Sequence, residues 1–240
     1  MKVHPNIKTL QAQGLGNRRH CENILASAEL LLNGSEFDPF ETLIQEGDTL
    51  EIDGTAYQIR RNVYVMLHKP AGYETSHKPS RHRSVFELLP PHYVARGIQA
   101  AGRLDVDTTG LLILTDDGQF LHRLISGKRG DKHAIEKIYQ ITPATPVTPT
   151  QLDHLLAGVE LQEDYEVEVV KASRCDVLDD GRLEMGITTG KYHQVKRMLA
   201  AVGNHVTALH RHSVGPYVLP DNLAAGAWCD ISPDAFDATP

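Results

Sequence analysis

Apolar and polar residues follow two different periods along this chain, and each period predicts one kind of element. Residues 64–67 and 111–114 are short, continuous apolar runs bounded by turn residues, which is typical of buried strands. Residues 119–126 and 192–202 carry apolar side chains at helical spacing, and Gly203 is a C-terminal stop signal for the second segment. The pattern therefore predicts a chain that contains both helices and strands.

The first 60 residues are expected to form a small separate unit. A weakly amphipathic segment at 7–13 is followed by a helix that we expect around 18–32. Turn residues then enclose positions 49–52, which alternate between polar and apolar and so predict a strand. We expect a small unit at residues 1–60 and a larger domain at 61–240.

Within the larger domain, the pattern predicts further strands, one of them at 182–188 where polar and apolar residues alternate, and one more helix. Residues 135–141 are expected to form a strand with Tyr139 on its polar face. A Pro/Thr linker then leads to residues 150–156, a short helix that we expect Thr150 to cap. The acidic segment 163–170 looks peripheral, and we assign it no chemistry.

Composition excludes several classes of protein. Of the 240 residues, 41% are hydrophobic, which is enough for a real core. The chain has no apolar run long enough to span a membrane, and its first residues lack the apolar core of a signal peptide, so we expect a cytosolic protein. The three cysteines are scattered and fit neither a disulfide framework nor a CxxC metal site.

The net charge of −7 argues against a nucleic-acid partner, because lysine and arginine normally supply the affinity for phosphates. The distribution of charge weakens this objection. Residues 191–212 contain four lysines and arginines and no acid, whereas residues 159–184 are dominated by Glu and Asp. This separation is expected if one face of the protein meets RNA.

Residues 101–118 carry the strongest chemical signal in the chain. Asp105 and Asp107 lie in a tight polar loop between Gly102 and Gly110, directly before the apolar run at 111–114. Asp and Thr at such positions often only satisfy backbone N–H groups through Asx and ST turns. A carboxylate pair in a turn can instead serve acid, base or nucleophilic chemistry.

Two other chemistries share part of this pattern. The spacing imitates the start of an EF-hand loop, but its twelfth position is Asp116 rather than Glu, and leucines fall where ligands are needed. Asp-dependent phosphatases place their nucleophile after a hydrophobic strand, whereas here the apolar strand follows Asp105. His205, His210 and His212 lack a helical pair with a nearby acid, so zinc is disfavoured.

Taken whole, the stretch resembles the RNA pseudouridine synthases of the RsuA type, whose loop consists of Gly-Arg-Leu-Asp followed by Asp-Thr-Thr-Gly-Leu. Every one of these positions is matched between Gly102 and Leu111. The resemblance implies that Asp105 is the catalytic residue and that Arg103 contacts RNA near a flipped nucleotide. It further implies that three residues hold the loop: Asp107, Thr108 and Thr109.

Two later segments extend the resemblance. The Lys-x-Tyr segment of the family supplies a ring that stacks on the target base, which implies this role for Tyr139, although a strand tyrosine alone is more often plain packing. The basic residue after His-Gln-Val pairs with the catalytic Asp in the family, which implies an ion pair between Lys196 and Asp105. Adjacent helical residues point about 100° apart, so we expect Arg197 to face RNA phosphate or solvent.

The resemblance also implies a fold and a function. The fold is α+β, with a mixed, mainly antiparallel sheet in a catalytic domain at 61–240 and a degenerate S4-like RNA-binding domain at 1–60. The function is isomerisation of a uridine, and segments near Lys196 and Arg211 match the branch that acts on 16S small-subunit ribosomal RNA. No cofactor and no metal is implied, and we expect a monomer that binds ribosomal RNA and no membrane.

Two other functions stay open at this point. A catalytically silent protein that binds ribosomal RNA as an assembly factor would keep the same segments. A phosphatase that uses Asp105 and Asp107 would require magnesium.

Overall fold

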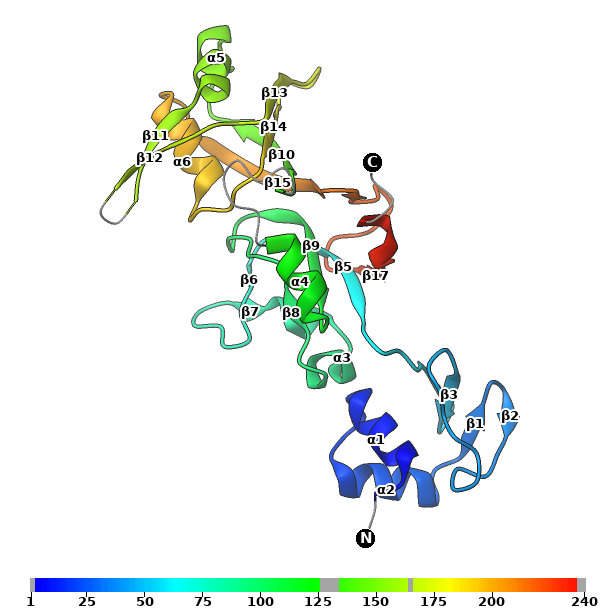
Figure 1. Ribbon diagram of the computed structural model, residues 1–240. Helices are drawn as coiled ribbons and strands as arrows, with labels where there is room; N and C mark the ends of the chain where they lie inside the picture. The colour runs from blue at the N-terminus through cyan, green and yellow to red at the C-terminus, as the bar shows by residue number, and fades with distance from the viewer. Residues whose placement is uncertain (1–2, 126–133, 164–165, 237–240) are drawn as a thin grey trace. The chain divides into compact units, whose positions relative to one another are not determined.

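The computed structural model describes residues 3–125, 134–163 and 166–236, and the chain divides into two compact units (Figure 1). The first unit contains the residues up to Val63 together with Leu89–Gln99. The second contains Tyr64–Leu88 and the residues from Ala100 onward. We expected one boundary after residue 60, and the structure differs because the chain returns once to the first unit.

The first unit packs helices against a four-stranded antiparallel sheet with the order β2-β1-β3-β4. Its core is formed by residues that include Ile7, Leu10, Leu25 and Leu50. Asn6 is buried beneath the loop before β3, where its side chain donates to the Pro39 and Thr42 carbonyls. The elements of this unit are α1 (Pro5–Ala12), α2 (Arg18–Ser27), β1 (Leu30–Leu32), β2 (Ser35–Glu36), β3 (Thr49–Ile52), β4 (Thr55–Gln58) and α3 (Pro91–Ala95).

The helix expected at 18–32 is shorter than its pattern indicated. It ends at Ser27, Ala28 takes an extended conformation, and Leu30–Leu32 pairs with β3 as a strand. The side chain of Asp53 accepts a hydrogen bond from the Glu29 amide at the turn. Tertiary packing overrides the local helical spacing here: the three leucines are half-buried in the sheet, and Leu30 and Leu32 pack against the core of the unit.

The second unit is built on a nine-stranded sheet with the main order β13-β14-β10-β15-β9-β5-β17, to which β16 and β8 add short pairings. Between described residues, every pairing along this order is antiparallel except that of β15 with β9, so the predicted α+β fold with a mixed, mainly antiparallel sheet is confirmed. The strands are β5 (Tyr64–Lys69), β8 (Gln99–Ala100), β9 (Thr109–Thr115), β10 (Lys137–Pro143), β13 (Arg174–Val177), β14 (Leu183–Ile187), β15 (Val206–Val214), β16 (Tyr217–Val218) and β17 (Trp228–Asp230).

The parallel pairing of β9 with β15 depends on Gly110. This residue has φ +106°, and a Cβ atom there would lie 2.3 Å from the carbonyl oxygen of Arg211. Glycine therefore lets the end of the polar loop press against β15. The continuing strand is buried along its length, as the continuous apolar run predicted.

Shorter elements complete the second unit. Helix α4 covers β9, and its Phe120 and Leu124 join the core formed with Leu111 and Ile113. The remaining elements are β6 (Tyr73–Glu74), β7 (Arg83–Ser84), η1 (Val85–Leu88), α4 (Gly118–Ile125), α5 (Pro149–Ala157), β11 (Val159–Gln162), β12 (Val167–Val170), α6 (Gln194–Ala201) and η2 (Pro233–Phe236). No helix in the described ranges is long and apolar enough to cross a membrane.

Two helix starts differ from expectation. Helix α5 is capped by Thr148 rather than Thr150, and Gln151 completes a capping box with it. Helix α6 begins at Gln194, because His193 has a left-handed backbone with φ 48° and therefore stands outside the helix. The side chain at position 193 is consequently aimed differently from one on a helix face.

The acidic segment after α5 is largely exposed, but it contacts the basic segment around α6. It forms the hairpin β11–β12, which lies beside α6 (Figure 1). Glu163 pairs with Arg197 at 2.9 Å, and Glu168 pairs with Lys191. The separation of charge along the sequence is therefore partly cancelled in space, because the acids return to the basic helix.

Candidate active site

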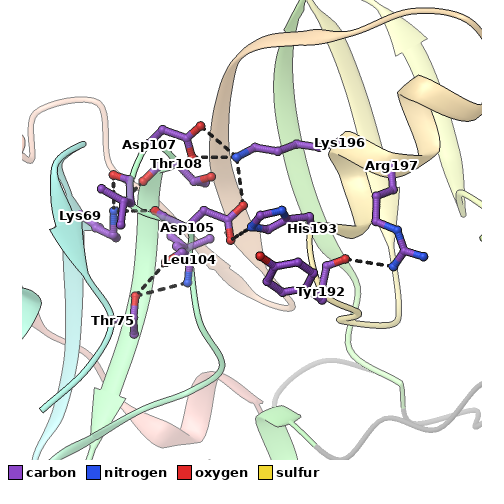
Figure 2. Close-up of polar contacts among 11 residues, drawn as sticks. Lys69, Thr75, Leu104, Asp105, Asp107, Thr108, Tyr192, His193, Lys196 and Arg197 are labelled. Carbon is purple, nitrogen blue, oxygen red and sulfur yellow. Dashed lines mark hydrogen bonds and ion pairs between the residues drawn. The ribbon is translucent and has the colours of Figure 1, made fainter. Parts of the chain in front are cut away.

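The loop between β8 and β9 is held by a buried lysine. Lys69 lies at the end of β5 and is completely buried, and its Nζ atom lies 2.9 Å from the Asp105 carbonyl oxygen and 2.8 Å from that of Thr108. The carbonyls of Pro70 and Val106 lie at 3.1 and 3.3 Å. Figure 2 shows Lys69 on one side of Asp105 and Asp107, and Lys196 on the other. In the sequence, Lys69 stands directly before Pro70, where a proline-initiated turn is expected, so the sequence pattern gives no sign of this buried role.

Burial lowers the pKa of Lys69 to about 8, against the charges of Asp107 and Asp105, which raise it. Other contacts tie down the same loop. Thr75 Oγ1 donates to the Leu104 carbonyl at 3.0 Å, and the Thr108 amide donates to the Asp105 carbonyl at 3.1 Å. The backbone around Asp105 is therefore fixed on both sides of the carboxylate.

The predicted ion pair between Lys196 and Asp105 is confirmed, with Nζ 3.0 Å from Oδ2 (Figure 2). Lys196 also donates to both carboxylate oxygens of Asp107, at 2.7 and 2.9 Å. One ammonium group thus bridges the two acids of the loop. The Asp107 side chain is 71% exposed and that of Asp105 is 28% exposed, so Asp105 is the acid on the protected side.

The contact between Lys196 and Asp107 shifts the pKa of both groups. The hydrogen bond from Lys196 lowers the pKa of Asp107. Burial acts to lower the pKa of Lys196, but hydrogen bonds to Asp107 and Asp105 outweigh it and raise the pKa overall. Lys196 therefore stays protonated, and its charge stabilises the ionised carboxylate of Asp107.

His193 is a second partner of Asp105 that the sequence did not single out. Its Nε2 atom lies 3.3 Å from Asp105 Oδ1, on the carboxylate oxygen that Lys196 does not contact. Its ring also stacks on that of Tyr192, with the centroids 3.8 Å apart. Because His193 was expected on a helix face, its approach to Asp105 could not be read from helical periodicity. The left-handed backbone at this position is what turns it toward the loop.

The far end of the loop is held by a histidine. Thr109 Oγ1 lies 2.9 Å from Nδ1 of His210, and the His210 ring makes an edge contact with that of His68. Burial, followed by the nearby His68, lowers the pKa of His210 to about 4. His210 is therefore neutral near pH 7 and serves as a hydrogen-bond partner of the loop rather than as a charge.

Asp105 lies at a pocket of about 170 Å³. The pocket walls are partly apolar and come from the loop, β10, β14, α6 and β15. Asp105 is the one acid among its described lining residues, against five lysines and arginines: Arg103, Lys137, Lys191, Lys196 and Arg211. A chain with an overall net charge of −7 thus concentrates positive charge at this pocket.

The structure brings three of the four expected substrate-binding residues to the pocket. Tyr139 lines it from β10 and is 7% exposed, while Arg103 lines it from the loop and is exposed. Lys196 lines it from α6. Tyr139 was expected on a polar face of its strand; it is buried, because the pocket lies within the unit.

Arg197 is the exception. It points away from the loop (Figure 2), and its guanidinium group pairs with Glu163 and donates to the carbonyls of Tyr192 and Gln162. The expectation that it faces RNA phosphate or solvent is therefore wrong in its geometry. The reason is that the acidic hairpin β11–β12, distant in sequence, folds onto the same side of α6.

Comparison with known proteins adds to this geometry. A family model described as RNA pseudouridylate synthase matches residues 63–201. The ribosomal small subunit pseudouridine synthase A of Vibrio parahaemolyticus is 36% identical over 227 residues, which cover 92% of this chain and 93% of that protein. The protein of the same name from Escherichia coli is 42% identical over 165 residues, with coverage of 69% and 68%.

Similarity extends to three dimensions. A solved structure described as a pseudouridylate synthase superposes with a TM-score of 0.65 and 32% sequence identity. The match covers 97% of this chain and 97% of that one, and so includes both units.

Proposed function

The chain belongs to the RNA pseudouridylate synthase family, and we propose from this that it isomerises a uridine of 16S small-subunit ribosomal RNA, with Asp105 as the catalytic carboxylate. The reaction breaks the bond between uracil N1 and ribose C1′, turns the detached base and joins its C5 to C1′. C5 then loses a proton and N1 gains one, so substrate and product have the same mass. This chemistry needs a carboxylate beside the sugar and a pocket that holds the base.

The observation that carries the proposal for Asp105 is its place at the pocket between two partners. Lys196 contacts one carboxylate oxygen and His193 the other, while Lys69 holds the backbone of the loop. A carboxylate held in this way can attack C1′ as a nucleophile or remove a proton from the ribose as a base. Asp107 is more exposed and directed to Lys196, which supports a role in holding that lysine.

Positive charge and an aromatic ring at the pocket support an RNA substrate. A target base must leave its stack to reach Asp105, and a flipped base is usually stacked on an aromatic side chain. We assign the stacking surface to Tyr139 and a phosphate contact to Arg103, which is exposed at the pocket. The first unit, similar to an S4 domain in its sequence pattern, is proposed as a second RNA-binding surface.

The choice of small-subunit RNA rests on the relatives. Both named bacterial proteins carry the small ribosomal subunit in their names, and one of them matches nearly the whole chain. We propose that the protein acts as a monomer in the cytosol, on 16S rRNA or on an assembly intermediate that contains it.

The test is to map pseudouridine in rRNA after incubation with the purified protein. We expect one site in 16S rRNA to be modified by the wild type and by Asp107→Asn, and to stay unmodified with Asp105→Asn. Both variants should bind the RNA, because neither removes a positive charge. Equal loss of activity in the two variants, or an active Asp105→Asn, contradicts the assignment within the loop.

The same experiment separates the other functions. A silent assembly factor binds rRNA but produces no pseudouridine with any variant. A phosphatase that uses Asp105 and Asp107 needs magnesium, so pseudouridine formation that continues in the presence of EDTA excludes this function. Mapping of rRNA from cells with and without the gene identifies the uridine that is modified.

A further inference from the structure

Two buried side-chain atoms have no hydrogen-bond partner in the part of the chain that the structure describes, and both belong to residues that line the pocket. They are the hydroxyl oxygen of Thr108 and one terminal nitrogen of the Arg211 guanidinium group. Thr108 is 1% exposed and Arg211 is 2% exposed. Unpaired buried polar groups are destabilising, and their coincidence at one pocket indicates that a ligand pairs with them.

Arg211 is positioned by contacts that leave this nitrogen free. Its Nε atom donates to the Leu111 carbonyl at 2.7 Å, and its backbone lies against Gly110 on the neighbouring strand. Among the described residues, no carboxylate pairs with Arg211. Burial, and next the charge of Arg211, lower the pKa of Lys137 to about 8, which places these two cations near each other at the pocket.

The buried Thr108 hydroxyl group is left without a partner for a similar reason. Its amide donates to the Asp105 carbonyl at 3.1 Å, and its own carbonyl accepts from Lys69 at 2.8 Å. The backbone is therefore fully engaged within the loop, and the hydroxyl group is left as the free polar atom. A threonine hydroxyl can both accept and donate a hydrogen bond.

The pocket indicates the chemical class of the partner. Its volume of about 170 Å³ is below the range of about 300–1,000 Å³ that holds drug-sized ligands, and Tyr139, Leu104 and Val195 contribute apolar surface. A flat heterocycle suits such walls, whereas a phosphate group gains nothing from them. Uracil presents carbonyl acceptors on either side of an imino N–H donor, which complements a guanidinium nitrogen and a hydroxyl oxygen.

We propose that Arg211 and Thr108 recognise the edge of the flipped uracil: Arg211 donates to a carbonyl oxygen, and the Thr108 hydroxyl accepts from N3–H. The inference rests on the proposed function and adds base recognition to it. If Arg211 contacts O4, the amino group that cytosine carries at that position would direct a donor at the guanidinium group, and the pair would select uracil over cytosine. Contact with O2 would give no such selection, because cytosine keeps that carbonyl.

Arg211 also acts on the reaction. When the N1–C1′ bond breaks, its electron pair goes to the ring, and the negative charge spreads onto the carbonyl oxygens. The guanidinium charge stabilises the detached base until C5 bonds to C1′, gives up its proton, and N1 is protonated. This holds whether Asp105 attacks C1′ or removes a ribose proton.

Thr108→Val is the decisive variant, because it keeps the shape of the side chain and removes the hydroxyl group. Since the hydroxyl has no protein partner in the described residues, we expect an unchanged or higher urea midpoint and a single-turnover rate that falls about tenfold or more. Thr115→Val is the matched control. Thr115 is also buried on β9 but its hydroxyl accepts from the Asp117 amide, so this variant should lose stability and keep the rate.

The substrate provides the second measurement. RNAs carrying 2-thiouridine or 4-thiouridine at the target replace one carbonyl oxygen with a weaker acceptor. We expect the wild type to react about tenfold more slowly with one of these two RNAs than with the uridine RNA, and the surface control Arg174→Met to behave in the same way. Arg211→Met should react slowly with the uridine RNA, and its rates with the uridine and thio-substituted RNAs should no longer differ.

The outcomes separate the two proposals. A wild type that forms no pseudouridine in any RNA overturns the proposed function and this inference with it. The inference alone is overturned if the wild type is active, Thr108→Val keeps the full rate, and the wild type reacts equally fast with the two thio-substituted RNAs. The proposed function would then stand.

Discussion

Lys69, beneath the loop that carries Asp105, allows a prediction whose magnitude can be calculated from the structure. Lys69 is fully buried, and its ammonium group contacts the carbonyls of Asp105, Val106 and Thr108 in the loop. Lys69→Met keeps an unbranched apolar side chain and removes the charge. We expect the loop to lose its anchor, so that Asp105 is no longer held at the pocket.

The expected loss of stability in Lys69→Met is the difference between two opposing contributions of the ammonium group. An ammonium group has three N–H donors, and a hydrogen bond to a charged group contributes about 1.5–3 kcal/mol. Burial opposes this, since lowering the pKa of Lys69 from 10.5 to about 8 corresponds to about 3.4 kcal/mol at 1.36 kcal/mol per pKa unit. The difference between the two terms gives an expected loss of about 1–6 kcal/mol in the free energy of unfolding for Lys69→Met.

The pH dependence gives a second signature. The pKa of Lys69 in the folded protein lies below that of an exposed lysine, so the folded state releases this proton first. As pH rises from about 8 to 10.5, the unfolded chain binds more protons at this residue, and its contribution to stability increases. The difference in unfolding free energy between wild type and Lys69→Met should therefore widen over this window, because Lys137 contributes equally to both proteins.

The assay combines urea unfolding at pH 7 and at pH 9.5 with single-turnover pseudouridine formation at pH 7. We expect the rate to fall by more than tenfold under conditions where Lys69→Met is still folded, because a small displacement of a catalytic group is costly. Lys171→Met, at an exposed position, controls for the loss of one charge. A Lys69→Met protein with wild-type stability and rate would refute the anchoring role.

The remaining predictions concern the pocket and α6. Tyr139→Leu should lower turnover by removing a stacking surface worth about 1–3 kcal/mol, with a smaller loss of RNA affinity in filter binding, and Tyr139→Phe should keep most activity. Lys196→Met should abolish most turnover, since both Asp105 and Asp107 lose their shared cation; normal turnover would show that the ion pair is dispensable. Arg197→Met should lower thermal stability and leave the salt dependence of RNA binding unchanged. A flatter salt dependence in this variant would show that Arg197 contacts an RNA phosphate.

Much of the local structure follows from the sequence alone. The buried strand β9 is a continuous apolar run, and the core face of α6 is set by apolar residues at helical spacing. The loop motif predicted Asp105 and its pairing with Lys196, although these residues belong to distant segments, because the resemblance extends over both. The strand and the helix face are each encoded in residue type and spacing within one short stretch, whereas the ion pair is implied only by the resemblance of two separate stretches to one family.

The tertiary structure decided what depends on contacts between stretches. Lys69 looks like a turn residue, and only the packing of the loop over the end of β5 makes it a buried anchor. Arg197 looks like a free charge until the β11–β12 hairpin brings Glu163 to it. The pattern of residues along the chain predicts whether an element is a helix or a strand and which of its faces is buried. It does not predict which distant polar group contacts that element, because burial and charge pairing depend on the neighbours that folding brings together.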